Sequence, residues 1–165
     1  MRIQFSLLVV SSLLTAACNH PDTSVSPDAL NDQRVPLSAA SIDIVAEGGF
    51  AGLTVHHQVT HDNRAFLYTV RHFCSANCPV PFDSTSGTLA AASADSLFAV
   101  IAAQRPLELK DDYGSTHGAA DFMDYTMRVT IGGTTKTIRG DDGSIPEPMR
   151  RILEAVHASI SAASR

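Results

Sequence analysis

Alternating apolar and polar residues predict a series of short β-strands after residue 40. Successive side chains of a strand point to opposite faces, so alternation marks a strand with one buried face. The polar turn His61–Arg64 and the pair Gly132–Gly133 separate neighbouring segments and predict β-hairpins. The segments expected to form strands are 42–46, 53–60, 65–72, 85–91, 123–131 and 134–139.

A first helix is predicted over residues 93–104, where the apolar period changes from two residues to about 3.6. Leu97, Val100 and Ile101 fall on one face of this helix and are expected to be buried. Ser93 is the expected N-cap, because a serine hydroxyl accepts a hydrogen bond from the first free backbone N–H groups.

A second helix is predicted over residues 145–160, with Ser144 and Glu147 forming a capping box at its start. Its apolar stripe is Ile145, Met149, Ile152, Leu153, Val156 and Ile160. Strands in hairpins followed by amphipathic helices predict an α+β domain over residues 41–162. We expect an antiparallel sheet built from hairpins, with two helices covering one face.

The N-terminal segment has the features of a bacterial lipoprotein signal. Residues 1–17 combine one positive charge with an apolar run too short to span a bilayer. Leu14–Cys18 resembles a lipobox, which predicts cleavage before Cys18 and acylation of this residue, with palmitate among the acyl chains. An ordinary secretory signal is the alternative. Residues 18–40 are polar and proline-containing, and are expected to form a flexible tether.

The chain has 3 cysteines, and lipidation of Cys18 would leave Cys74 and Cys78 as a pair. Disulfides persist outside the cytoplasm, so this pair is predicted to close a small structural loop. A redox-catalytic pair is the weaker alternative, since the spacing is not Cys-x-x-Cys. The expected location is the cell envelope, with the domain facing the periplasm or the exterior and held to the membrane only through its lipid.

Charge argues against a nucleic-acid partner. The chain carries 12 Lys and Arg against 17 Asp and Glu, a net charge of -5, and it has no cationic stripe. Catalytic signatures are missing as well: there is no nucleophile elbow, phosphate-binding loop or cofactor motif. The acidic pairs Asp111–Asp112 and Asp141–Asp142 lie beside turns, where we expect them to be solvated. We therefore predict a protein that is not an enzyme and needs no cofactor.

The histidine-rich segment His57–His61 has the spacing of a zinc-protease helix but not its chemistry. Gln58 replaces the glutamate that acts as general base, and the segment alternates like a strand. Residues four apart in a strand lie about 13 Å apart, too far to share one metal ion. An incidental metal site formed by His56 or His61 with His72 is a weaker hypothesis than surface histidines.

Three glycines surround one phenylalanine in the segment Gly48, Gly49, Phe50, Ala51, Gly52 and Leu53. Glycine allows sharp turns and close backbone approaches. One interpretation is a turn or bulge whose Phe50 packs in the core. The other is a protruding loop that offers Phe50 to a partner as an aromatic anchor.

Three blocks resemble the emfourins, small protein inhibitors of protealysin and other thermolysin-like metalloproteases. The blocks are Ile44–Leu53, Tyr125–Val129, and Asp142–Glu147 with the helix that follows. The segment with Cys74 and Cys78 differs, and is more similar to bacterial lipoproteins with a Cys-x3-Cys-Pro motif. The resemblance implies an emfourin-like fold and a metalloprotease as partner of residues 48–53. The alternative function is a non-catalytic envelope module that binds another protein or a small ligand.

Overall fold

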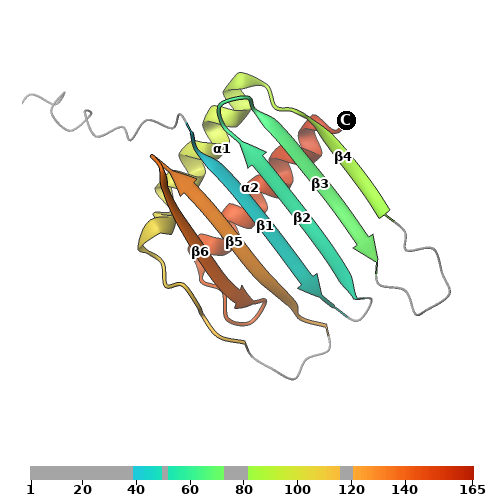
Figure 1. Ribbon diagram of the computed structural model, residues 1–165, viewed down its shortest axis with the longest axis vertical. Coiled ribbons are helices and arrows are strands. Elements are labelled where there is room, and N and C mark those ends of the chain that lie inside the picture. The colour runs from blue at the N-terminus through green and yellow to red at the C-terminus, as the bar shows by residue number, and fades with distance from the viewer. Residues whose placement is uncertain (1–38, 50–51, 73–81, 116–120) are drawn as a thin grey trace, which may run out of the picture. The chain divides into compact units, whose positions relative to one another are not determined.

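Six β-strands and two α-helices make up the folded part of the chain (Figure 1). The computed structural model describes residues 39–49, 52–72, 82–115 and 121–165, which all belong to one unit, residues 34–165. The strands are β1 (Ser41–Gly48), β2 (Leu53–Thr60), β3 (Ala65–His72), β4 (Phe82–Thr88), β5 (Met123–Ile131) and β6 (Thr134–Asp141). The helices are α1 (Ala91–Ala103), the short 3-10 helix η2 (Pro106–Glu108) and α2 (Glu147–Ala163).

The strands form one antiparallel sheet in the order β4-β3-β2-β1-β5-β6. Hairpins join β2 to β3 and β5 to β6, as the alternation and turn residues predicted, and β1 also pairs with β2, the strand that follows it. The pairing of β1 with β5 joins strands that are distant in the sequence, because β2, β3, β4 and α1 lie between them in the chain. The predicted α+β class, with an antiparallel sheet of hairpins and two helices, is confirmed.

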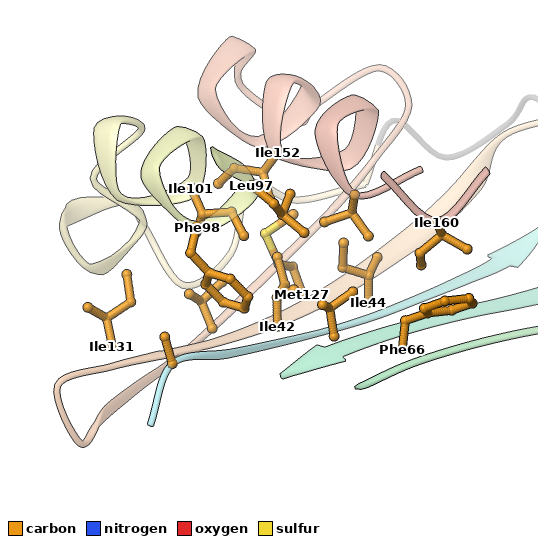
Figure 2. Packing of buried hydrophobic residues seen from close by; sticks show 14 of the residues in the cluster. Ile42, Ile44, Phe66, Leu97, Phe98, Ile101, Met127, Ile131, Ile152 and Ile160 are labelled. Carbon is orange, nitrogen blue, oxygen red and sulfur yellow. The ribbon is translucent and has the colours of Figure 1, made fainter. Parts of the chain in front are cut away.

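The helices lie on one face of the sheet, and the core fills the space between the two layers (Figures 1 and 2). Alternate residues of β1, Ile42 and Ile44, point into it, together with Val129 and Met127, their neighbours on β5. Four residues of α2, at the spacing of one helical stripe, close the layer from the other side: Met149, Ile152, Val156 and Ile160. The opposite face of the sheet carries mainly threonines, serines and charged residues.

The helix starts differ from the predicted ones, and neither predicted N-cap residue caps its helix. The N-cap of α1 is Ala90, and the Ser93 N–H already donates to the Ala90 carbonyl oxygen at 3.0 Å, inside the helix. The N-cap of α2 is Pro146. The Ser144 hydroxyl instead accepts a hydrogen bond from the Asp141 N–H at 2.8 Å and donates to the Gly114 carbonyl at 2.9 Å. Both predicted caps, Ser93 and the Ser144–Glu147 box, are wrong.

Two further expectations around α1 need correction. The preceding strand spans residues 82–88 rather than 85–91, because the chain turns into the helix at buried Leu89. The buried face of α1 is Ala94, Leu97, Phe98 and Ile101, an uninterrupted i, i+3, i+4, i+7 stripe. Val100 falls outside this stripe and is 40% exposed.

Candidate functional site

The connection between β1 and β2 is a tight turn that depends on glycine. Gly48, Gly49 and Gly52 have φ angles of 128°, 67° and 58°, which residues other than glycine rarely adopt. The Gly52 N–H donates to the Gly49 carbonyl oxygen at 3.0 Å, and half-buried Leu53 then begins β2. Phe50 and Ala51 lie outside the described residues, so the choice between a core and an exposed Phe50 stays open.

Gly48 is also required by the close approach of the chain just before β5. A Cβ atom at Gly48 would lie 2.5 Å from the carbonyl oxygen of Phe122, well inside van der Waals contact. The same carbonyl oxygen accepts a hydrogen bond from the Gly49 N–H at 3.0 Å. The turn is therefore anchored to the residue that precedes β5, and a side chain at position 48 would disrupt this contact.

Asp142 fixes the start of β5 from the other side. Its carboxylate accepts hydrogen bonds from the Met123 N–H at 2.9 Å and from the Tyr125 hydroxyl at 2.7 Å. Its backbone N–H donates to the Met123 carbonyl at 3.1 Å, and the Arg150 guanidinium donates to its carbonyl at 2.7 Å. Burial raises the pKa of Tyr125, and so do the hydrogen bond to Asp142 and the negative charge of the Asp142 carboxylate. Tyr125 therefore stays a neutral donor.

The neighbouring Asp141 is 1% exposed, so the expectation of a solvated Asp141–Asp142 pair is wrong. Its carboxylate accepts hydrogen bonds from the N–H groups of Gly143 and Ser144 at 3.0 and 2.8 Å. The turn folds back over the carboxylate and leads directly into α2. The other acidic pair differs, since Asp111 and Asp112 are both exposed.

These contacts bring together parts of three separate sequence blocks, Ile44–Leu53, Tyr125–Val129 and the segment that begins at Asp142. β1 pairs with β5 so that Gly48 lies opposite Met123, and Asp142 binds both Met123 and Tyr125. Phe122, which the sequence did not single out, is 37% exposed beside the glycines. We call this region the loop-end surface. Its described members are Gly48, Gly49, Gly52, Leu53, Phe122, Met123, Tyr125 and Asp142.

The loop-end surface is suited to binding rather than to bond chemistry. Two of its polar side chains are already hydrogen-bonded: the Tyr125 hydroxyl donates to the Asp142 carboxylate, which also accepts from the Met123 N–H. Its described residues present glycine backbone and the partly exposed Phe122 ring. A surface whose backbone is already hydrogen-bonded can bind a partner with little loss of conformational entropy.

The three histidines considered for an incidental metal site, His56, His61 and His72, have different neighbours. His56 lies on the open face of the sheet with its Nε2 3.3 Å from an Asp43 carboxylate oxygen. His61 lies at the other end of β2, with its Nε2 3.0 Å from Asp95 and its ring against Phe98. His72 pairs with Leu53. Among the residues that the structure describes, no three histidines, cysteines or acids are close enough to hold a metal ion.

His57 is not a surface histidine, because it faces the helices. Its ring centroid lies 4.9 Å from that of Tyr68 on β3 and 5.9 Å from that of His157 on α2. Burial, together with the nearby His157 and His56, lowers the pKa of His57 to about 4. Its Nε2 atom is buried and has no hydrogen-bond partner within the described part of the chain.

The other predicted sites lie outside the described residues. These are the lipidation site Cys18, the Cys74–Cys78 pair, the signal segment and most of the tether. Within the described residues, no helix is long and apolar enough to cross a membrane.

Comparison with known proteins assigns no family to the chain. No protein-family model matches it, and no curated protein matches it.

Proposed function

We propose that this chain is a non-catalytic envelope lipoprotein, anchored through Cys18, whose folded domain binds and inhibits a thermolysin-like metalloprotease. One observation carries the proposal. The segments that resemble emfourins are far apart in the sequence, and they meet at the loop-end surface through the β1–β5 pairing and the Asp142 hydrogen bonds. A surface assembled in this way from separate segments is the pattern expected of a binding site.

The anchoring of the turn supports a role in recognition. The Gly49 and Gly52 N–H groups are both hydrogen-bonded, and Phe122 O closes the turn against the start of β5. A turn whose flanking glycines are already hydrogen-bonded loses less conformational entropy when a partner arrives. A buried aromatic side chain can then supply a large share of the binding free energy, and Phe50 at the middle of the turn sequence is the residue proposed for this role.

Inhibition of this kind requires no reaction by the inhibitor. A loop that enters or overhangs the cleft of a protease excludes the substrate. The lipid at Cys18 and the segment up to residue 40 would keep the domain close to the membrane but free to meet a partner outside the cytoplasm. The net charge of -5 is compatible with a protein partner and unfavourable for nucleic acid.

The test compares Phe50→Ala with the parent chain in an inhibition assay against a thermolysin-like metalloprotease. Loss of an aromatic anchor worth about 2 kcal/mol should weaken inhibition roughly 30-fold and leave the melting temperature nearly unchanged. The matched control is Phe82→Ala, which removes a 55% exposed ring from β4 and should inhibit like the parent, because β3 lies between β4 and β2, the nearest strand of the loop-end surface.

Two results would contradict the proposal. A parent chain that leaves several thermolysin-like proteases fully active at micromolar concentration would favour the alternative function, binding of another envelope protein or a small ligand. A large fall in melting temperature for Phe50→Ala would instead make Phe50 a core residue, because Phe→Ala in a core costs about 3–5 kcal/mol.

A further inference from the structure

The two edges of the sheet are protected to different degrees. At β6, Arg139 forms a bridge with Asp112: its N–H donates to the Asp111 carbonyl at 2.8 Å, and its carbonyl accepts from the Tyr113 N–H at 2.9 Å. The Lys136 ammonium also binds the Asp111 carboxylate. A covering segment and positive charges are both common means of blocking strand addition. The β6 edge is therefore closed over part of its length.

The β4 edge has neither protection. All seven residues of β4 are exposed, and within the described residues it pairs only with β3. Its sequence, Phe-Asp-Ser-Thr-Ser-Gly-Thr, contains no lysine, arginine or proline. An open edge of this length presents unpaired N–H and C=O groups to any strand that can align with it.

The β4 strand is nevertheless held in one register. The Phe66 ring packs over Gly87, where a Cβ atom would lie 2.8 Å from the ring and would force the ring to move. At the other end of the strand, the Arg71 guanidinium lies 5.7 Å from the centre of the Phe82 ring. A strand fixed at both ends is an ordered template for pairing, and an aromatic ring over an edge glycine is a known way of stabilising such a strand.

The helical layer does not block this edge. Asp83, Thr85 and Gly87 alternate on the helix-facing side of β4, yet all three are exposed. Thr85 lines a hollow of about 180 Å³ together with residues of β3 and α2, namely Tyr68, His157, Ile160, Ser161 and Ser164. The helix-facing side of β4 is therefore open to solvent, and another strand can approach its edge.

We infer that the β4 edge pairs with the β4 edge of a second copy of this chain, antiparallel about a two-fold axis at Thr85. In this register Ser84 faces Ser86 of the other copy, and hydroxyl pairs across strands are favourable. Asp83 faces Gly87, the smallest residue, and Phe82 faces Thr88. The only charge of the strand, Asp83, would lie about 13 Å from its own copy, beyond the screening length at physiological salt.

The paired sheet would be continuous across the two copies and would have no open β4 edge. This inference does not depend on the proposed function, because β4 lies three strands away from β1 in the sheet. A dimer through β4 would leave both loop-end surfaces free.

Charge substitutions at Ser84 and Ser86 test both the edge and the register. Sedimentation of the full chain in detergent should show a dimer at micromolar concentration. The variant S84K/S86K places two lysine pairs opposite each other across the axis and should weaken association at least about tenfold. The variant S84K/S86E places lysine opposite glutamate in the same register and should restore the dimer. The control T135K/T137K on β6 should associate like the parent.

Ser84, Ser86 and Thr135 are exposed and Thr137 is half-buried, and thermal unfolding of each variant checks that it keeps its fold. A parent chain that stays monomeric at high micromolar concentration would overturn the inference, as would a S84K/S86K variant that dimerises like the parent. Equal loss of association in S84K/S86K and S84K/S86E would overturn the antiparallel register about Thr85.

Discussion

At the scale of single residues, the two adjacent histidines of β2 have opposite environments. His56 lies on the open face near Asp43, whereas His57 lies beneath α2 between Tyr68 and His157. Burial of an imidazole disfavours its charged form, and two neighbouring histidines add to this effect. The pKa of His57 is lowered to about 4, so the fold stabilises its neutral form.

The low pKa of His57 predicts that acid destabilises the fold. Its pKa is about 6.5 when unfolded, so between pH 6.5 and pH 4 the unfolded chain binds more protons than the folded chain. The contribution of His57 is therefore fully present above pH 6.5 and is lost as the pH falls towards 4. We expect this loss to be about 1–2 kcal/mol, a value reduced for solvent screening of a half-buried ring.

Urea unfolding of the parent and of His57→Gln at pH 7 and pH 4.5 measures this effect. The free energy of unfolding should change less between the two pH values in His57→Gln than in the parent. The control His72→Gln, at the end of β3, should keep the pH dependence of the parent. Equal pH dependence in the parent and His57→Gln would show that another group is responsible.

At the scale of elements, the β1–β2 hairpin is joined to β5 by contacts that only glycine allows. Gly48 combines a φ of 128° with the close approach of Phe122 O, and Gly49 donates to the same oxygen. Gly133, in the β5–β6 turn, has a φ of 79° but no atom within 4 Å of the position of a Cβ. A side chain at position 48 would therefore meet both backbone strain and a steric clash, whereas one at position 133 would meet backbone strain alone.

Substitution of these two glycines by alanine should have unequal effects. Gly48→Ala introduces both strain and a clash with backbone, and we expect it to lower the free energy of unfolding by about 2–4 kcal/mol. Gly133→Ala introduces strain alone and should cost about 1 kcal/mol. Urea unfolding of both variants provides the measurement. Equal losses would mean that Phe122 moves away from the new methyl group at little cost.

The sequence predicts the elements that depend on near neighbours and misses the features that depend on distant ones. Alternation and the Gly132–Gly133 turn identify the hairpins, because both signals are local. The cap of α2 is mispredicted because Ser144 binds Gly114, thirty residues away. The loop-end surface could be predicted only in part for the same reason: its glycines are conspicuous, but Asp142 and Phe122 join them through the β1–β5 pairing.

At the scale of the whole molecule, the sheet separates two surfaces with different chemistry. The loop-end surface lies where β1 ends and β5 begins, and it presents glycine backbone and an aromatic ring. The β4 edge runs along one side of the sheet and presents serine, threonine and unpaired backbone. Because β2 and β3 lie between β4 and β1 in the sheet (Figure 1), a partner at one surface can bind without contact at the other.

Amide hydrogen exchange of the full chain, with and without a catalytically inactive thermolysin-like metalloprotease, tests the central claim most directly. Protease should slow exchange in residues 48–53 and 122–125, which carry the loop-end surface, while residues 82–88 of β4 exchange as in the free chain. Unchanged exchange in residues 48–53 and 122–125, or protection confined to β4, would contradict the claim that the loop-end surface binds a protease.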